Sequence, residues 1–286
     1  MKAQVSQVVI RFFLLSCMSL FIASLNSGSN GNCYYVGNHH EAVLIDVGIS
    51  CRETELRMNR LNLSMKKVKA IFISHEHSDH IKGVAGISKK YKLPVYVTPN
   101  TLGHRGLRVK QHLLFPFKAN EPIAIGQLTI TGFPKFHDAN DPHSFIIANE
   151  TVKVGVFTDL GVVCENVIHH FKQCHAAFLE ANYDDHMLET GPYPLHLKNR
   201  IRGDKGHLSN EQALELFRKH RPSFMSHLFL SHLSKENNSP VLVERLFKSM
   251  AGDTNIVIAS RYRETKVYPI HEQPVVQEVQ LSLFGG

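Results

Sequence analysis

Apolar runs of strand length alternate with helix-like stretches along most of this chain, and polar residues gather where the runs end. Residues 68–73 are apolar and β-branched, which predicts a buried strand, and residues 81–91 predict a helix. The polar residues 74–80 therefore lie in a turn from strand to helix. Open α/β sheets carry their functional groups at such strand ends, so the pattern predicts an α/β protein with its chemistry at one sheet edge.

Similar runs recur on both sides of this turn. They predict strands at residues 19–25, 33–36, 41–48, 93–97, 127–133, 144–148, 151–158, 175–180, 223–230 and 256–259. Helices are expected at residues 52–61, 101–112, 210–220 and 238–249, of which 101–112 is rich in basic residues. No linker or repeat interrupts the series, so a single domain is expected.

Four side chains that can hold a metal fall within six residues of the turn: His75, His77, Asp79 and His80. On an extended backbone, the rings of His75 and His77 leave the same face and can hold one ion. Asp79 and His80 come where the chain turns into the helix, and they can serve a second ion nearby. Imidazole and carboxylate ligands suit Zn²⁺, Mn²⁺ or Fe²⁺ rather than Ca²⁺. The alternative is a solvated turn with histidines present by chance, since the chain holds 19 of them.

Net charge and cysteine content indicate which kind of partner and which cellular compartment suit this protein. The formal net charge of +7 suits an anionic partner such as nucleic acid. The five cysteines are scattered and form no Cys-x-x-Cys motif. This distribution is typical of a reduced, cytoplasmic protein rather than of a disulfide scaffold.

The N-terminus allows two interpretations. Residues 12–23 form an apolar run of signal-peptide length, which is too short for a comfortable transmembrane span. Residues 19–25, however, supply the first expected strand, and cleavage after the run would remove it. We therefore expect a cytoplasmic protein without stable membrane association, in which residues 1–17 are an extension outside the fold.

The string His-x-His-x-Asp-His at residues 75–80 resembles the signature of the metallo-β-lactamase superfamily. The resemblance implies a hydrolase domain over residues 18–266, built as a four-layer αβ/βα sandwich with two divalent ions at one edge of its sheets. It implies seven ligands in chain order: His75, His77, Asp79, His80, His137, Asp159 and His232.

The resemblance also divides these ligands between the two ions. The first triad is His75, His77 and His137, and the second triad is Asp79, His80 and His232, with Asp159 bridging the ions. His143 competes with His137 but lies nearer to the next strand. Asp46, at the end of a strand that closes with Asp-x-Gly, would support the metal-binding loop. The ions could be Zn²⁺ or Mn²⁺, because these ligands suit both.

Members of the superfamily hydrolyse β-lactams, thioesters, lactones and phosphodiesters, so the fold alone does not fix the substrate. Residues 206–210, Gly-His-Leu-Ser-Asn, and 231–234, Ser-His-Leu-Ser, resemble a bacterial single-domain branch of DNA exonucleases encoded beside a cell-wall two-component regulator. This resemblance implies a metal-dependent phosphodiesterase, a 5′→3′ exonuclease on DNA (RNA being the other nucleic acid considered), acting in replication or repair.

The expected catalytic residues are Asp79, Glu180 and His207. In nucleases of the superfamily, a histidine near position 207 that binds no metal donates a proton, and a carboxylate orients it. Glu180 and His207 could form that pair. Alternatively, His207 only orders the loop before the helix at residues 210–220.

A basic stretch precedes His207 and contains Lys198, Arg200, Arg202 and Lys205. Cations beside an aromatic residue, here Tyr193, suit a phosphate backbone. The alternative is a mobile surface loop.

Residues 267–286 are expected to form a flexible tail. Its residues Gln280, Leu281, Ser282, Leu283 and Phe284 resemble the motif by which bacterial replication and repair proteins bind the sliding clamp. Apolar anchors on a flexible tail fit such a role. The alternatives are a chance amphipathic tail and one that folds back on the core.

Two other functions compete with the exonuclease. A small-molecule hydrolase of the same fold would act on a lactone, a thioester or a cyclic phosphodiester, and the basic stretch argues against it. A non-catalytic clamp-associated binding protein would not need a complete set of metal ligands.

Overall fold

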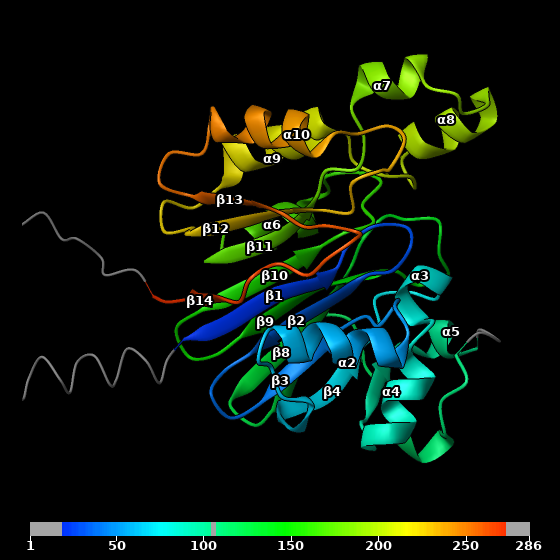
Figure 1. The fold of residues 1–286 in the computed structure, drawn as a ribbon, viewed down its shortest axis with the longest axis vertical. Helices are drawn as coiled ribbons and strands as arrows, with labels where there is room; N and C mark the ends of the chain where they lie inside the picture. Colours follow the sequence, from blue (N-terminus) through cyan, green and yellow to red (C-terminus); the bar gives the residue numbers. More distant parts are fainter. Residues whose placement is uncertain (1–18, 104–106, 273–286) are drawn as a thin grey trace, which may run out of the picture.

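The computed structural model describes residues 19–103 and 107–272, which form two seven-stranded sheets packed face to face (Figure 1). In spatial order, the first sheet contains β14 (Tyr268–Ile270), β1 (Leu20–Asn26), β2 (Cys33–Gly37), β3 (Ala42–Ile45), β4 (Val68–Phe72), β5 (Val95–Val97) and β6 (Leu114–Pro116). The second sheet contains β13 (Asn255–Ile258), β12 (His227–Ser231), β11 (Ala176–Glu180), β10 (Lys153–Phe157), β9 (His143–Ala148), β8 (Leu128–Pro134) and β7 (Pro122–Ile125).

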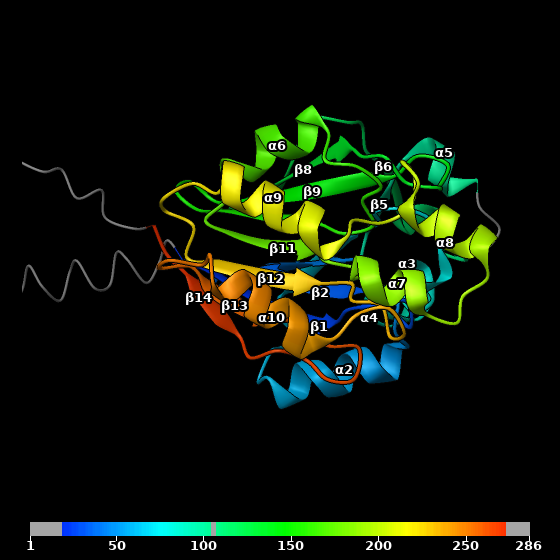
Figure 2. The ribbon, with the colours of Figure 1, turned by 90° about the horizontal axis from the view of Figure 1, so that it is seen from above.

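Helices cover the outer face of each sheet (Figures 1 and 2). The first sheet is covered by α2 (Cys51–Arg60) and α4 (Val84–Tyr91), and the second by α6 (Glu165–Phe171), α9 (Asn210–His220) and α10 (Pro240–Lys248). Four other helices of the described chain lie toward one end of the strands: α3 (Ser78–Ile81), α5 (Pro99–Leu102), α7 (Asp185–Thr190) and α8 (Leu195–Arg202). The expected αβ/βα sandwich is confirmed. Within the described ranges, every helix is too short or too polar to cross a membrane.

Strand residues alternate between separate hydrophobic cores, which explains the four layers. In β11, Ala176 and Phe178 join the core between the two sheets, whereas Ala177 and Leu179 join the core under the helices of the second sheet. The same alternation in the first sheet separates the central core from a third core beneath α2 and α4. Because both faces of these strands are buried, they appear in the sequence as nearly continuous apolar runs.

Parallel strands in both sheets end on the side of the molecule where the metal-ligating residues lie. The strands β3 to β6 are parallel to one another, as are β10 to β13. Close packing at this edge depends on Gly48, because a Cβ atom there would lie 1.6 Å from the backbone oxygen of Asp79. The glycine of the Asp-x-Gly turn therefore lets the loop after β4 pack directly against the loop after β3.

The prediction of a helix over residues 101–112 is wrong. The helix α5 ends at Leu102, residues 107–110 have no regular structure, and only a short 3₁₀ turn follows at Gln111–Leu113. Arginine and lysine favour helices, but Pro99 starts a helix that has no apolar face long enough to sustain it.

Two further expectations need correction. The basic stretch is not a loop over most of its length, because Lys198, Arg200 and Arg202 lie in α8. The tail begins later than residue 267, because Tyr268–Ile270 pairs antiparallel with β1 as strand β14. The extension at 1–17 and the clamp-like motif at 280–284 lie outside the described residues.

Candidate metal centre

Each predicted ligand lies at or just after the end of a strand. The loop between β4 and α3 supplies His75 and His77, and α3 itself supplies Asp79 and His80. His137 follows β8, Asp159 follows β10, and His232 follows β12 directly. The two sheets thus bring together residues that are up to 157 positions apart in the sequence (232 minus 75).

The three side chains of the first triad lie close together. Ligand atoms of His75, His77 and His137 all fall within 4.8 Å of one another. The Nε2 atom of His75 is 3.1 Å from the Nδ1 atom of His77. His143, the competitor of His137, instead directs Nδ1 at the backbone oxygen of Asp141, 2.9 Å away.

The second triad forms an adjoining group. The Oδ2 atom of Asp79 lies 3.5 Å from Nε2 of His80 and 3.8 Å from Nε2 of His232. Three donor atoms at this separation can surround one cation.

Asp159 lies between the two triads. Its Oδ2 atom is 3.3 Å from Nε2 of His80, and its Oδ1 atom is 3.9 Å from Nε2 of His137. Oδ1 also lies 3.5 Å from Nδ1 of His232, so Asp159 contacts residues of both triads, as a bridging ligand would.

The unpaired polar atoms of the site test whether it fits metal ions. His137 Nε2, Asp159 Oδ2 and His232 Nε2 are buried and have no hydrogen-bond partner among the described residues. A buried polar atom without a partner is costly, and such atoms rarely converge unless something else satisfies them. Divalent cations would satisfy all three, so the donor set fits the expected ions.

The electrostatics of the site keep His75 and His137 neutral, whereas its carboxylates raise the pKa of His80 and of His232. Burial lowers the pKa of His75 well below its ordinary value and that of His137 to about 4, so both rings are neutral and keep a lone pair. Burial would raise the pKa of Asp159, but His232 and His80 outweigh it and hold that pKa well below its usual range. Burial likewise opposes protonation of His232, yet Asp159, Asp79 and Glu180 raise its pKa to about 10. The site thus attracts positive charge.

Three residues of the site leave their strands through a left-handed backbone. The φ angles are +58° at Asp46, +56° at Asp159 and +56° at His232. Residues other than glycine rarely adopt this conformation, and it concentrates at functional sites. The sharp turn at each strand end directs a polar side chain across the edge of its sheet.

Asp46 supports the loop after β4, as expected for a residue that does not bind the metal itself. Its Oδ2 atom is 2.7 Å from Nδ1 of His80, and its Oδ1 atom accepts from the backbone N–H of Ser74 at 2.8 Å. The Ser74 hydroxyl also donates to Oδ2 of Asp46, at 2.7 Å. Asp46 therefore fixes the ring of His80 so that Nε2 points at the site.

Glu180 connects His207 to His232. Its Oε1 atom lies 2.8 Å from Nδ1 of each histidine, and its Oε2 atom accepts from the backbone N–H groups of Leu160 and Leu208. Burial would raise the pKa of Glu180, but the two histidines outweigh it and lower that pKa to about 2. The expected pair of Glu180 and His207 is therefore present as a geometric arrangement, and its chemical role stays a prediction.

Other residues at the site were missed by the sequence reasoning. The amide of Asn32 donates to Oδ2 of Asp79 at 3.2 Å and lies 3.0 Å from Nε2 of His80.

Two more residues lie near the first triad and Asp159. Oδ1 of Asp138 is buried 3.3 Å from Nε2 of His137. The buried Lys135 donates to the backbone oxygen of Thr158. Of these residues, only Asp138 had a sequence feature that could have identified it, namely its position next to His137.

The four basic residues of α8 and the turn after it differ in their contacts. Arg200 pairs with Asp138, and Arg202 pairs with Glu189. Lys198 donates to a backbone oxygen of α7, whereas Lys205 has no hydrogen bond or ion pair with a described residue. The pair of Arg200 and Asp138 joins α8 to the first triad through His137.

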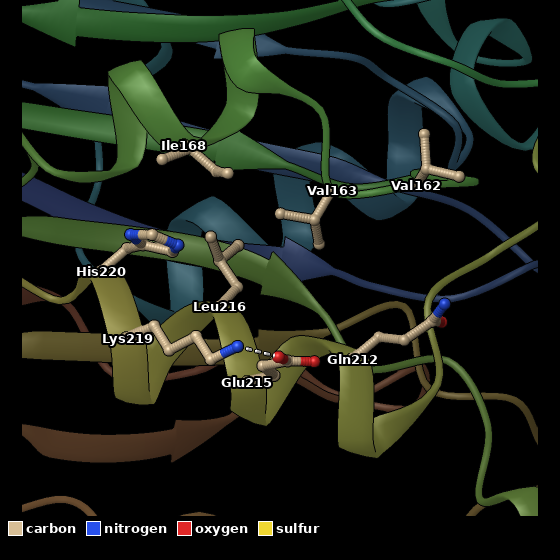
Figure 3. Close-up of a pocket in the computed structure, with 8 residues that line it drawn as sticks. All are labelled: Val162, Val163, Ile168, Gln212, Glu215, Leu216, Lys219 and His220. Atoms are coloured by element: carbon tan, nitrogen blue, oxygen red, sulfur yellow. Dashed lines mark hydrogen bonds and ion pairs between the residues drawn. The ribbon is translucent and has the colours of Figure 1, made fainter.

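A separate cleft of about 330 Å³ lies between α6 and α9 (Figure 3). Its apolar wall includes Val163, Ile168 and Leu216, and its rim carries the ion pair of Lys219 and Glu215. None of the predicted ligands lines it, so the cleft is distinct from the candidate metal centre.

The fold and the two triads define a metallo-hydrolase. The family model described as the beta-lactamase superfamily domain matches residues 41–232, and the chain belongs to this superfamily. Membership implies binding of divalent metal ions. The resemblance inferred from the histidine string is thereby confirmed.

The relatives are more specific. The chain is 35% identical to the exodeoxyribonuclease YycJ of Bacillus anthracis over 77% of its own length and 85% of that protein. It is 28% identical to the exodeoxyribonuclease WalJ of Streptococcus pneumoniae over 88% of its own length and 96% of that protein. A solved metallo-beta-lactamase fold protein, YhfI from Bacillus subtilis, covers 88% of the chain with a TM-score of 0.67 at 15% identity, and 99% of YhfI is covered. This last similarity supports the fold alone.

Proposed function

We propose that this protein is an exonuclease that hydrolyses DNA with two divalent ions held by the first and second triads. The observation that carries the proposal is similarity over most of the chain to two exodeoxyribonucleases, in a protein that also has all seven ligand positions filled. The proposed direction is 5′→3′, and the proposed ions are Zn²⁺ or Mn²⁺. A role in replication or repair belongs to the same proposal.

The two triads and Asp159 would hold the ions at the edge shared by both sheets. When bound, such ions supply a nucleophile at neutral pH and offset the negative charge of the phosphate. His207 would donate a proton to the leaving oxygen, because Glu180 holds its Nδ1 atom and Nε2 makes no hydrogen bond to a described residue. The side chain of His207 is 21% exposed, so a substrate can reach it.

The basic residues of α8 would attract the phosphate backbone. Lys198, Arg200, Arg202 and Lys205 lie beside the site on a helix and turn that Asp138 and Glu189 hold in place. Clustered cations of this kind raise the affinity for nucleic acid without reading its sequence. Of the four, Lys205 is the most available for a phosphate.

Two features outside the centre complete the proposal. Residues 280–284 would bind a bacterial sliding clamp and so bring the enzyme to DNA. The scattered cysteines and a DNA substrate both suit a cytoplasmic location; Cys33, Cys51, Cys164 and Cys174 are free thiols.

The test is incubation of the metal-loaded protein with end-labelled DNA and RNA carrying 5′-phosphate or 5′-hydroxyl ends. We expect release of nucleotides from the 5′ end of DNA and none from a His75→Ala variant. Cleavage of a small chromogenic phosphodiester without any action on DNA would instead support a small-molecule hydrolase. Degradation of DNA by His75→Ala at the wild-type rate would exclude the proposed centre.

A further inference from the structure

The loop between β13 and β14 carries an exposed tyrosine between two arginines, Arg261, Tyr262 and Arg263. Tyr262 is 71% exposed, whereas the strand residues Tyr34 and Tyr35 are buried. The side chains of Tyr262 and Arg263 make no hydrogen bond or ion pair within the described part of the chain. A large aromatic ring and a guanidinium group therefore face solvent together.

This loop is held firmly by α2. The buried Arg57 donates to the backbone oxygen of Tyr262 at 3.2 Å and to that of Leu25 at 2.8 Å. One turn further along the helix, Nε of Arg60 lies 2.7 Å from Oε1 of Glu264. Tyr262 is thus exposed on a fixed backbone, and binding a ligand there costs little ordering of the loop.

The loop borders a pocket of about 440 Å³ that none of the predicted ligands lines, but that reaches residues next to His232. Ser27 and Leu233 line the pocket, and both contact the strand end that supplies His232. The backbone N–H of His232 donates to the Ser27 hydroxyl at 2.8 Å, and Arg261 donates to the backbone oxygen of Leu233 at 3.0 Å. In Figure 1, the loop after β13 lies beside the turn between β1 and β2, where Asn30 donates to the backbone oxygen of Arg261 at 2.9 Å.

The pocket carries an excess of positive charge. Three of the four charged residues in its lining are basic: Lys235, Arg261 and Arg263. The acidic one, Glu244, already pairs with Lys248 at 2.8 Å. Arg261 is occupied by backbone and hydroxyl oxygens, and Lys235 lies 3.2 Å from Glu236. Arg263 is therefore the cation most available to an anion.

We propose that this pocket binds a nucleotide of the single DNA strand that leads to the metal centre. The base stacks on Tyr262, and the adjoining phosphate faces Arg263. Stacking on an exposed aromatic ring beside a basic groove is the usual way in which proteins hold single strands without reading their sequence. This inference rests on the proposed exonuclease function and adds the loop between β13 and β14 to the contacts of the substrate strand.

The test measures the affinity of the metal-loaded protein for a fluorescent single-stranded oligonucleotide with phosphorothioate linkages, which resist hydrolysis. From the range known for base–aromatic stacking, we expect Tyr262→Ala to weaken binding by about ten-fold, while Tyr262→Phe binds as the wild type does. Arg263→Ala should weaken binding and flatten its dependence on salt. Cleavage of a small chromogenic phosphodiester, which does not reach the pocket, should be the same in all three variants.

The matched control is Arg218→Ala, which removes one exposed arginine from α9, away from the pocket. Affinity unchanged in both Tyr262→Ala and Arg263→Ala would overturn the inference, as would an equal loss in Arg218→Ala. If the wild type binds the strand but leaves ordinary DNA intact, the exonuclease proposal fails, and the binding comparison still decides the role of the pocket. If hydrolysis is retained and Tyr262→Ala binds normally, only this inference fails.

Discussion

At the scale of single residues, Glu180 joins the centre to the residue proposed to move a proton. One of its oxygens accepts from both His207 and His232, and the other is held by two backbone N–H groups. Because Glu180 is fully buried, both histidine rings are fixed in orientation. His232 then directs Nε2 toward the second triad, and His207 is left to face the substrate.

The first prediction concerns His207. The His207→Ala variant should lower kcat on DNA by about 10²- to 10⁴-fold, the range of general acid–base catalysis. Its metal content, measured by atomic emission, should equal that of the wild type, because His207 belongs to neither triad. Loss of metal from His207→Ala would show that this residue is a ligand or supports one.

The second prediction compares two histidines that the sequence left in competition. His137→Ala should lose bound metal and DNA hydrolysis together, because its Nε2 atom is one of the unpaired buried atoms of the site. His143→Ala should retain both, since that ring faces Asp141 and Phe117. Equal metal content in the two variants would remove His137 from the first triad.

A third prediction tests the support of His80 by Asp46. Asp46→Ala leaves Nδ1 of His80 and the hydroxyl of Ser74 without their acceptor. Metal affinity or activity should fall by about 10- to 100-fold, as for other outer partners of metal ligands. Metal titration of the apoprotein measures this directly, and wild-type affinity would contradict the assigned role.

At the scale of elements, the sequence predicted the strands well because most are buried on both faces. The runs at 68–73 and 175–180 correspond to β4 and β11 within two residues. The prediction failed where local propensity and tertiary contacts disagree. Residues 107–110 have no regular structure, and β14 pairs with β1, a partner almost 250 residues away. The left-handed turns at Asp46, Asp159 and His232 were not predicted, because Asp and His adopt this conformation only at a few positions, which the sequence does not mark.

The fourth prediction concerns how α2 holds the loop that contains Tyr262. Arg57→Met removes the guanidinium group that donates to Leu25, Asn26 and Tyr262, and it leaves these buried oxygens unpaired. The free energy of unfolding should fall by about 2 kcal/mol, measured by urea denaturation. The same substitution at the exposed Arg52 of α2 should change it by less than about 0.5 kcal/mol. A similar effect of both substitutions would contradict the anchoring role of Arg57.

At the scale of the whole molecule, the sandwich brings the strand ends of two sheets to one edge, and neither sheet alone supplies a complete triad. The first triad takes His137 from the second sheet, and the second triad takes His232 from it, while the other four triad residues follow β4 of the first sheet. Asp159 follows β10 of the second sheet. The metal centre therefore depends on the packing of the two sheets against each other. The chain beyond this sandwich includes the clamp-like residues 280–284.

The fifth prediction separates that tail from catalysis. Deletion of residues 280–286 should abolish binding to a purified bacterial sliding clamp, measured by isothermal titration calorimetry, and leave DNA hydrolysis unchanged. Deletion of Gly285 and Gly286 alone keeps the motif and should keep clamp binding. Equal clamp affinity of the two deletions would contradict the role of the motif.

The most direct test of the central claim measures metal content and DNA hydrolysis in the same preparations of wild type and Asp159→Asn. Asp159 has one oxygen near His80 of the second triad and the other near His137 of the first, so it would link the two ions. We expect the wild type to bind two ions per chain and to release nucleotides from 5′-labelled DNA until a chelator is added. The variant should bind fewer ions and leave the DNA intact. Wild-type hydrolysis by Asp159→Asn, or hydrolysis that persists after the metal is removed, would contradict the account.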